Sequence, residues 1–163
     1  VLNGREGVSI ANYNCPGQIV ITGEAAAVAE AGTALKEAGA RRVLPLKVSG
    51  PFHSPMMRPA GEELAKVFAG VSMNPLKIPY VANINAEVIT DCGRIEGLLV
   101  EQVSGSVRWQ QSVETMIREG VDTFVEIGPG KTLTGFLRKI DKNVKAYHIG
   151  SWEEAVQVCE ELK

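Results

Sequence analysis

Short runs of apolar and β-branched residues dominate the first third of the chain, and their spacing predicts its elements. Residues 8–11 and 18–22 are two such runs, and YNCPG between them has turn chemistry, so we expect a hairpin or two neighbouring strands. From residue 24 to residue 40, apolar side chains recur at helical spacing. Residues 41–48, RRVLPLKV, predict a further strand, which Pro45 places at a sheet edge.

The rest of the chain alternates between amphipathic runs and short apolar ones. Residues 78–90 predict two short strands around a turn, 122–128 predict a strand buried in a parallel sheet, and 145–150 is strand-like. Single strands separated by helices are typical of an α/β layer. The expected helices cover residues 60–71, 94–105, 107–120, 131–140 and 151–163.

Composition narrows the class of protein. Apolar residues make up 45% of the chain and charged residues 22%, which is typical of a folded globular domain. The net charge of −2 provides no bulk attraction to nucleic acid or anionic membrane, and no apolar run approaches the roughly 18 residues of a membrane span. Three widely spaced cysteines without a CxxC pair favour a reducing compartment. We expect a cytoplasmic protein with neither nucleic-acid nor membrane partners.

One of the two histidines, His53, lies in the segment VSGPFHSPMM, between a predicted strand and the next predicted helix. Sheet-based enzymes project catalytic side chains from such connections. Pro51 and Pro55 restrict the backbone around the histidine, and an imidazole is a base near neutral pH without further tuning. His53 is therefore a candidate general base, with a purely structural role as the alternative.

The glycine-rich segment EIGPGKTLTG, residues 126–135, invites comparison with phosphate-binding loops. A P-loop requires G-x-x-x-x-G-K-[ST], and Val125 occupies the place of its first glycine, so the motif is absent. Two interpretations remain for this segment. Its free N–H groups could hold an anion or polar group, or the glycines could form a tight turn that packs helix against sheet.

Other polar side chains carry weaker signals. Asn12 and Asn14 lie in an expected β-turn, where asparagine side chains usually hydrogen-bond the turn itself. Cys15 could act as a thiol nucleophile with His53, although no neighbour in the sequence would activate it. His148 has no carboxylate or cysteine partner at ligand spacing, so we expect a structural role for it and no metal site.

Four stretches in register resemble the malonyl-CoA:acyl carrier protein transacylases of fatty acid and polyketide synthesis. Each motif is modest alone, but their order and spacing match that family along essentially the whole chain. The stretches are ANYNCPGQIVITG at 11–23, VSGPFHSPMM at 48–57, QVSGSVRWQQSVE at 102–114 and VEIGPGKTLTG at 125–135.

The resemblance implies a mechanism. In that family a serine in a GHSxG elbow attacks malonyl-CoA, a histidine acts as its base, and the phosphopantetheine thiol of acyl carrier protein resolves the acyl-serine. The resemblance places this histidine at His53 and the main-chain carbonyl that orients its ring at Gln102. Phe52 resembles the residue that accompanies malonyl over branched extender units, and Asn12 and Asn14 are further candidate substrate-binding residues. No cofactor is implied, and the expected partners are malonyl-CoA and acyl carrier protein.

The sequence departs from the family pattern at the nucleophile. None of its serines lies in G-x-S-x-G, and the family's carboxylate-binding arginine and glutamine loop are also missing. The chain begins VLNGREG, without an initiator Met, so we expect the C-terminal part of a transacylase that is inactive without its N-terminal segment. The implied fold is α/β. Residues 1–48 would be part of a ferredoxin-like small subdomain, and 49–163 the C-terminal part of an α/β-hydrolase-like large subdomain.

Two other functions stay open at this point. The chain could be a non-catalytic module that binds a carrier protein or another subunit, or a small thiol enzyme that uses Cys15 and His53. A basic cluster near the His53 loop would suit an acidic carrier protein, but a solvated surface explains it equally well. The cluster consists of Arg41, Arg42, Lys47 and Arg58.

Overall fold

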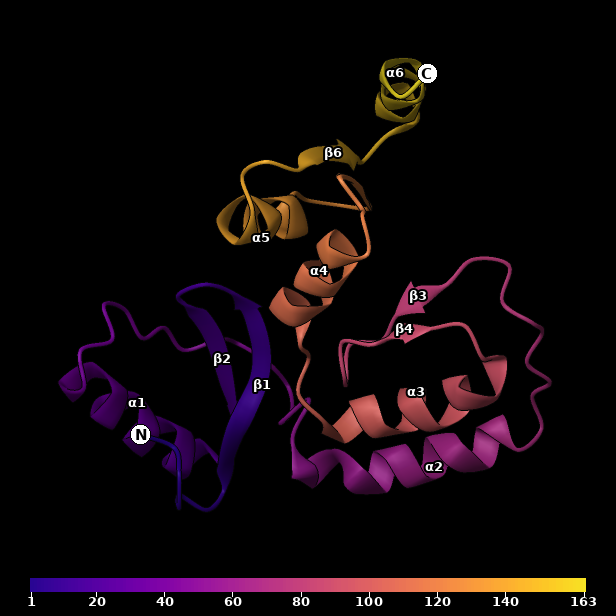
Figure 1. Cartoon of the computed structure of the whole chain (residues 1–163). Coiled ribbons are helices and arrows are strands. Elements are labelled where there is room, and N and C mark those ends of the chain that lie inside the picture. Colours follow the sequence, from indigo (N-terminus) through magenta and orange to yellow (C-terminus); the bar gives the residue numbers. More distant parts are fainter.

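The computed structural model describes all 163 residues and shows a mixed α/β chain. Its strands form three two-stranded sheets: β1 with β2 and β3 with β4 are antiparallel, whereas β5 with β6 is parallel (Figure 1). The elements are β1 (Val8–Cys15), β2 (Gln18–Gly23), α1 (Ala25–Glu37), α2 (Arg58–Phe68), β3 (Tyr80–Val81), β4 (Val88–Ile89), α3 (Ile95–Ser104), α4 (Trp109–Arg118), β5 (Thr123–Ile127), α5 (Thr132–Ile140), β6 (Lys145–Ile149) and α6 (Trp152–Glu161), with 3-10 turns η1 (Pro55–Met57) and η2 (Cys92–Arg94).

The predicted strand pair at the start of the chain is a hairpin around the two-residue loop Pro16–Gly17. Proline fixes φ at the first loop residue, and Gly17 has a φ of 77°, a left-handed conformation that glycine adopts at little cost. β1 extends to Cys15 and does not end near Ala11, because its last residues still pair with β2. The hairpin is therefore longer than its sequence pattern indicated.

The strand predicted for residues 41–48 is absent. No strand pairs with this segment, and Pro45 lacks the N–H that a ladder would require. Val43 Cγ1 lies 3.3 Å from where a Cβ on Gly32 of α1 would be, whereas Leu44 is 57% exposed. The segment is thus anchored to α1 by one side chain and otherwise runs as irregular chain.

Helices α2 and α3 lie side by side below the β3–β4 hairpin (Figure 1). Gly61 permits their close approach, since a Cβ at this position would lie 3.2 Å from the carbonyl oxygen of Val100 in α3. On the other face of α3, Leu98 packs with Ala82 and Ile89 into the buried apolar cluster of this part of the chain. This packing fixes the position of the C-terminal end of α3.

The parallel pairing of β5 with β6 agrees with the α/β layer that the sequence predicted. The expectation that β5 is buried on both faces is wrong, because Ile127 is 78% exposed and Val125 is also exposed. A parallel strand normally has neighbours at both edges and helices on both faces. With only two strands in this sheet, much of β5 has no such neighbour.

The chain exposes more surface than a compact monomer of its mass. Its accessible surface is 10998 Å², whereas about 7,900 Å² is typical for 17.5 kDa. Exposed large apolar side chains include Ile78 and Trp152. Apolar surface of this extent is typical of faces that pack against further polypeptide. None of the helices has the length and apolarity to cross a bilayer.

Candidate active site

His53 occupies the third position of a tight turn formed by residues 51–54. Its φ is 58°, in the left-handed region that bulky L-residues rarely adopt. The Ser54 hydroxyl donates to the carbonyl oxygen of Pro51 at 2.6 Å, and the Met57 N–H donates to the Ser54 carbonyl at 2.9 Å. Such a backbone costs about 1–2 kcal/mol, and similar strain clusters at functional sites. The surroundings of His53 therefore stabilise a conformation that the residue alone would avoid.

The ring of His53 faces the end of α3. Its Nδ1 lies 3.0 Å from the main-chain carbonyl oxygen of Gln102. Because a carbonyl only accepts, Nδ1 carries the proton, and Nε2 of the neutral ring keeps a free lone pair. The ring is half-buried, and its Nε2 makes no hydrogen bond within the chain. His53 and the Gln102 carbonyl, which the family resemblance paired, are therefore in contact. The catalytic role of this pair stays a prediction.

The last turn of α3 supplies this carbonyl. Gln102 is among the final residues of the helix, whose carbonyl groups lack an intrahelical N–H partner. The helix ends at Gly105, where a side chain would collide with Ile84 and approach the Glu101 carbonyl oxygen to 3.1 Å. A helix C-terminus carries partial negative charge, which favours a cation beside it. The end of α3 can therefore both orient the imidazole and stabilise its protonated form.

The segment after Gln102 joins this helix end to β1. Val107 exchanges two backbone hydrogen bonds with β1: its N–H donates to Ala11 at 2.7 Å, and its carbonyl accepts from Tyr13 at 2.8 Å. Ser106 adds a side-chain hydrogen bond of 2.6 Å to another β1 carbonyl. The first hairpin and the His53 contact are thus held in one arrangement.

The candidate substrate-binding residues lie in two places. Asn12 and Asn14 are in β1, so the prediction of a β-turn around Tyr13 is wrong; the strand continues because Tyr13 pairs with Ile19 of β2. Both asparagines are half-buried, and neither side chain makes a hydrogen bond within the chain. Phe52 precedes His53 in the turn and is 48% exposed. That any of them contacts substrate stays a prediction.

Cys15 lies in an environment unlike that of a reactive thiol. It is 2% exposed, and its Sγ donates a hydrogen bond to the Gln18 side chain at 3.6 Å. Nucleophilic cysteines occupy partly exposed, electropositive positions. The burial of Cys15 therefore argues against a thiol mechanism with His53.

A carboxylate of the chain itself occupies the N-terminus of α5. Glu126 of β5 accepts hydrogen bonds from the N–H groups of Leu133 and Thr134, at 3.0 and 2.7 Å, and from the Thr134 hydroxyl at 2.6 Å. Burial alone would raise the pKa of Glu126, but these hydrogen bonds outweigh it and lower the pKa below its usual value. Of the two interpretations of this segment, the geometry favours the structural turn, because Glu126 already occupies the N–H groups of Leu133 and Thr134.

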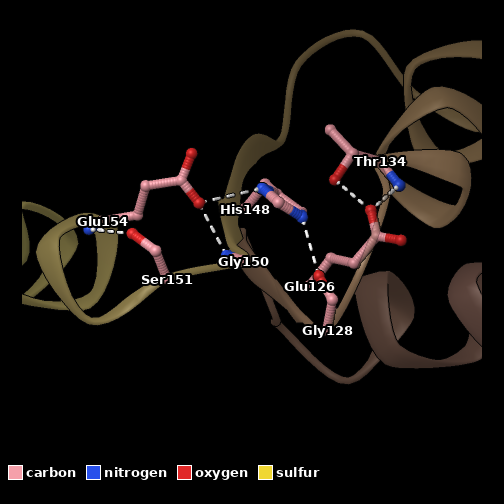
Figure 2. A network of polar contacts seen from close by, with 7 residues as sticks. All are labelled: Glu126, Gly128, Thr134, His148, Gly150, Ser151 and Glu154. Atoms are coloured by element: carbon pink, nitrogen blue, oxygen red, sulfur yellow. Dashed lines mark hydrogen bonds and ion pairs between the residues drawn. The ribbon is translucent and has the colours of Figure 1, made fainter.

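His148 has a carboxylate partner that the sequence interpretation missed. Its Nε2 lies 2.9 Å from the Gly128 carbonyl oxygen, and its Nδ1 lies 3.4 Å from a carboxylate oxygen of Glu154 (Figure 2). The same Glu154 oxygen accepts from Gly150 at 2.6 Å, and this hydrogen bond, with the charge of His148, lowers the pKa of Glu154. This contact was not predicted, because Glu154 does not lie at metal-ligand spacing from His148. The missed signal was the capping pattern SWEE, which begins at Ser151 and orients Glu154 at the start of α6.

Comparison with known proteins places the chain in a class. The acyl transferase domain family matches residues 2–158, and the chain therefore belongs to that family. Its relatives include the malonyl CoA-acyl carrier protein transacylase of Bacillus subtilis strain 168, which is 42% identical over 156 residues. A transacylase of the same name from Staphylococcus aureus strain COL is 42% identical over 144 residues, or 88% of this chain.

Solved structures share its fold. The MCAT of Streptococcus pneumoniae superposes with a TM-score of 0.89 at 44% identity and covers 94% of this chain. A malonyl-transacylase in complex with a type II PKS acyl-carrier protein (PlMCAT:AntF) gives a TM-score of 0.92 at 38% identity over 99% of this chain. These matches confirm the α/β fold. The division at residue 48 stays a prediction.

The chain spans about half the length of the relatives it matches. Its match covers 96% of this chain but 49% of the Bacillus subtilis transacylase, and 50% of the Streptococcus pneumoniae structure. These matches define the family and the fold of this chain.

Proposed function

We propose that this chain provides the general base of a malonyl-CoA:acyl carrier protein transacylase, with His53 as that base. The serine nucleophile would lie on a polypeptide segment outside the chain, N-terminal in the family. The observation that carries the proposal is the 3.0 Å contact of Nδ1 with the Gln102 carbonyl oxygen, because it leaves Nε2 free to accept a proton. The relatives named above support the choice of reaction.

In the proposed reaction, the serine oxygen attacks the thioester carbon of malonyl-CoA as Nε2 of His53 takes the hydroxyl proton. The C–S bond breaks, the coenzyme A thiolate takes the proton from the imidazolium, and a malonyl-serine ester remains. The phosphopantetheine thiol of acyl carrier protein then gives its proton to Nε2 and attacks the ester. The serine oxygen leaves and regains that proton. Atoms and charges balance without a cofactor.

The negative end of α3 takes the electrostatic part that an aspartate takes in Ser-His-Asp triads. The Gln102 carbonyl holds the proton on Nδ1 and faces the positive charge that develops on the ring of His53. A neutral carbonyl contributes less than a carboxylate, but the helix end adds its dipole. A thiol nucleophile in the second step needs less activation than an amine or water, which suits a moderate base.

Substrate and carrier contacts belong to the same proposal. Phe52 stands next to His53, where its bulk would disfavour an α-methyl group by at most about 1–3 kcal/mol. Asn12 and Asn14 are proposed to provide amide groups for the acyl-CoA. The exposed basic cluster of Arg41, Arg42, Lys47 and Arg58 would meet the acidic carrier protein.

Intact mass spectrometry tests where the acyl group goes. The chain is incubated with malonyl-CoA, alone and together with the portion of the Bacillus subtilis transacylase that it does not match. We expect a malonyl adduct on the added polypeptide and none on this chain. An adduct on the chain itself would show that it has its own nucleophile and would contradict the proposal. Association without any acylation of either polypeptide would favour the non-catalytic binding module.

A further inference from the structure

The turn that carries His53 is closed by a side-chain hydrogen bond in addition to its backbone. In most β-turns the N–H of the fourth residue donates to the carbonyl of the first. Residues 51–54 form such a turn, and the hydroxyl of Ser54 donates to the same Pro51 carbonyl at 2.6 Å. The third position, with φ of 58°, belongs to His53. The Ser54 hydroxyl therefore makes the closest hydrogen bond across this turn.

The Ser54 hydroxyl makes this hydrogen bond and no helix cap. Ser54 precedes Pro55 at the start of η1, the place where a serine side chain ordinarily caps the following helix. Its hydroxyl makes no such cap and points back to Pro51. The residue is 1% exposed, so water does not replace the bond if it is lost.

We propose that Ser54 is a positioning residue for His53. Its hydroxyl holds the 51–54 turn in the conformation that brings Nδ1 of His53 to the Gln102 carbonyl and directs Nε2 outward. This inference rests on the proposed function for its catalytic meaning, but the geometry can be tested without any turnover. Without the hydroxyl, the left-handed backbone at His53 loses the close hydrogen bond that stabilises it, and the ring leaves Gln102.

The two histidines of the chain provide a spectroscopic signature. Since carbonyls accept, the contact with Gln102 requires a proton on Nδ1 of His53, whereas the contact with Gly128 requires one on Nε2 of His148. Long-range proton–nitrogen NMR of the labelled chain above pH 8 distinguishes the two tautomers. We expect His53 in the Nδ1–H form and His148 in the Nε2–H form.

The variant Ser54→Ala should shift His53 towards the Nε2–H form that predominates in unconstrained histidine, while His148 stays unchanged and reports that the fold persists. Ser49→Ala is the matched control, because Ser49 is exposed in the same loop and makes no side-chain hydrogen bond. Ser54→Cys keeps the volume but donates weakly, so it should give an intermediate proportion.

An unchanged Nδ1–H signal of His53 in Ser54→Ala would overturn the inference. If the alanine variant unfolds, an Nδ1–H fraction of His53 in Ser54→Cys equal to that of the unsubstituted chain would overturn it. In a fusion of the chain to the unmatched portion of the Bacillus subtilis transacylase, Ser54→Ala should lower kcat about 10- to 100-fold with little change in KM. An inactive wild-type fusion with the tautomers as expected would reject the proposed function and leave the positioning role standing.

Discussion

His53 is a bulky residue in a backbone conformation that glycine adopts without cost. Its φ of 58° and its contact with Gln102 come from the same turn, so the backbone strain accompanies the orientation of the ring. Strained backbone of this kind persists only where neighbouring bonds fix it. At the scale of the residue, the conformation that positions the His53 imidazole therefore lowers the stability of the folded chain.

Two substitutions that both remove the imidazole ring measure the backbone strain by itself. His53→Gly should be more stable than His53→Ala by about 1 kcal/mol, because glycine relieves the left-handed strain and alanine does not. Urea unfolding of both variants measures the difference. Equal stability of the two, or a more stable alanine variant, would show that the turn is not strained at this position.

The sequence indicated some residues of the site and missed others for identifiable reasons. His53 could be found because proline on both sides and a strand-to-helix connection mark it locally, and the Gln102 carbonyl came from a family resemblance alone. The burial of Cys15 depends on packing between distant segments, which no local pattern shows. Glu154 was not predicted as a partner of His148, because its spacing from the histidine is not that of a metal ligand, although the capping pattern that contains it was visible.

At the scale of elements, the contact of α2 with α3 depends on a glycine. A side chain at position 61 would press on Val100, whereas a Cβ on Gly97 of α3 meets nothing within 4 Å. We expect Gly61→Leu to destabilise the chain by about 1–3 kcal/mol through overpacking. Gly97→Ala should stabilise it by about 0.5–1 kcal/mol through helix propensity. Thermal unfolding compares them, and a neutral Gly61→Leu would refute the close approach.

The start of α5 predicts a pH dependence. Because hydrogen bonds from Thr134 and Leu133 hold the pKa of Glu126 below its usual value, its ionised form stabilises the folded chain above the usual carboxyl pKa, and this contribution is lost as the pH falls through the lowered value. Glu126→Gln should therefore cost about 0.5–1 kcal/mol at pH 7 and much less at an acid pH at which the Glu126 carboxyl group is protonated in the folded chain.

Urea unfolding at both pH values measures this difference, with Glu62→Gln as the control. Glu62 is exposed on α2 and makes no hydrogen bond or ion pair through its side chain. An equal cost of Glu126→Gln at the two pH values would contradict an electrostatic cap.

Helices were easier to predict than strands, for a physical reason. α3 ends at Gly105 and α1 and α4 lie where their periodicity indicated, because a helix satisfies its backbone within its own segment. The strand expected at 41–48 is absent and β5 is exposed, because a strand requires neighbours that its own sequence does not specify.

At the scale of the whole molecule, the chain has more accessible surface than is typical for its mass, and it matches about half the length of its relatives. We expect the extra surface to pack against the polypeptide segment that the proposal requires. A two-stranded parallel sheet with Ile127 78% exposed is expected to gain neighbours from the segment that the proposal requires. Ile127→Asp should leave the stability of the chain alone almost unchanged. It should weaken association with the unmatched portion of the Bacillus subtilis transacylase at least about tenfold.

Calorimetric titration measures that affinity. Asn143→Asp is the control, since it adds the same charge at an exposed polar position. Equal affinities of the Ile127→Asp variant and the unchanged chain would place the contact surface elsewhere.

The central claim is that His53 is the base of malonyl transfer, and one rate comparison tests it most directly. The chain is fused to the unmatched portion of the Bacillus subtilis transacylase, and malonyl transfer to acyl carrier protein is measured with and without His53→Ala. We predict that the substitution lowers kcat/KM by about 10²- to 10⁴-fold while both fusions unfold cooperatively. A folded His53→Ala fusion that transfers malonyl at nearly the unsubstituted rate would contradict the account.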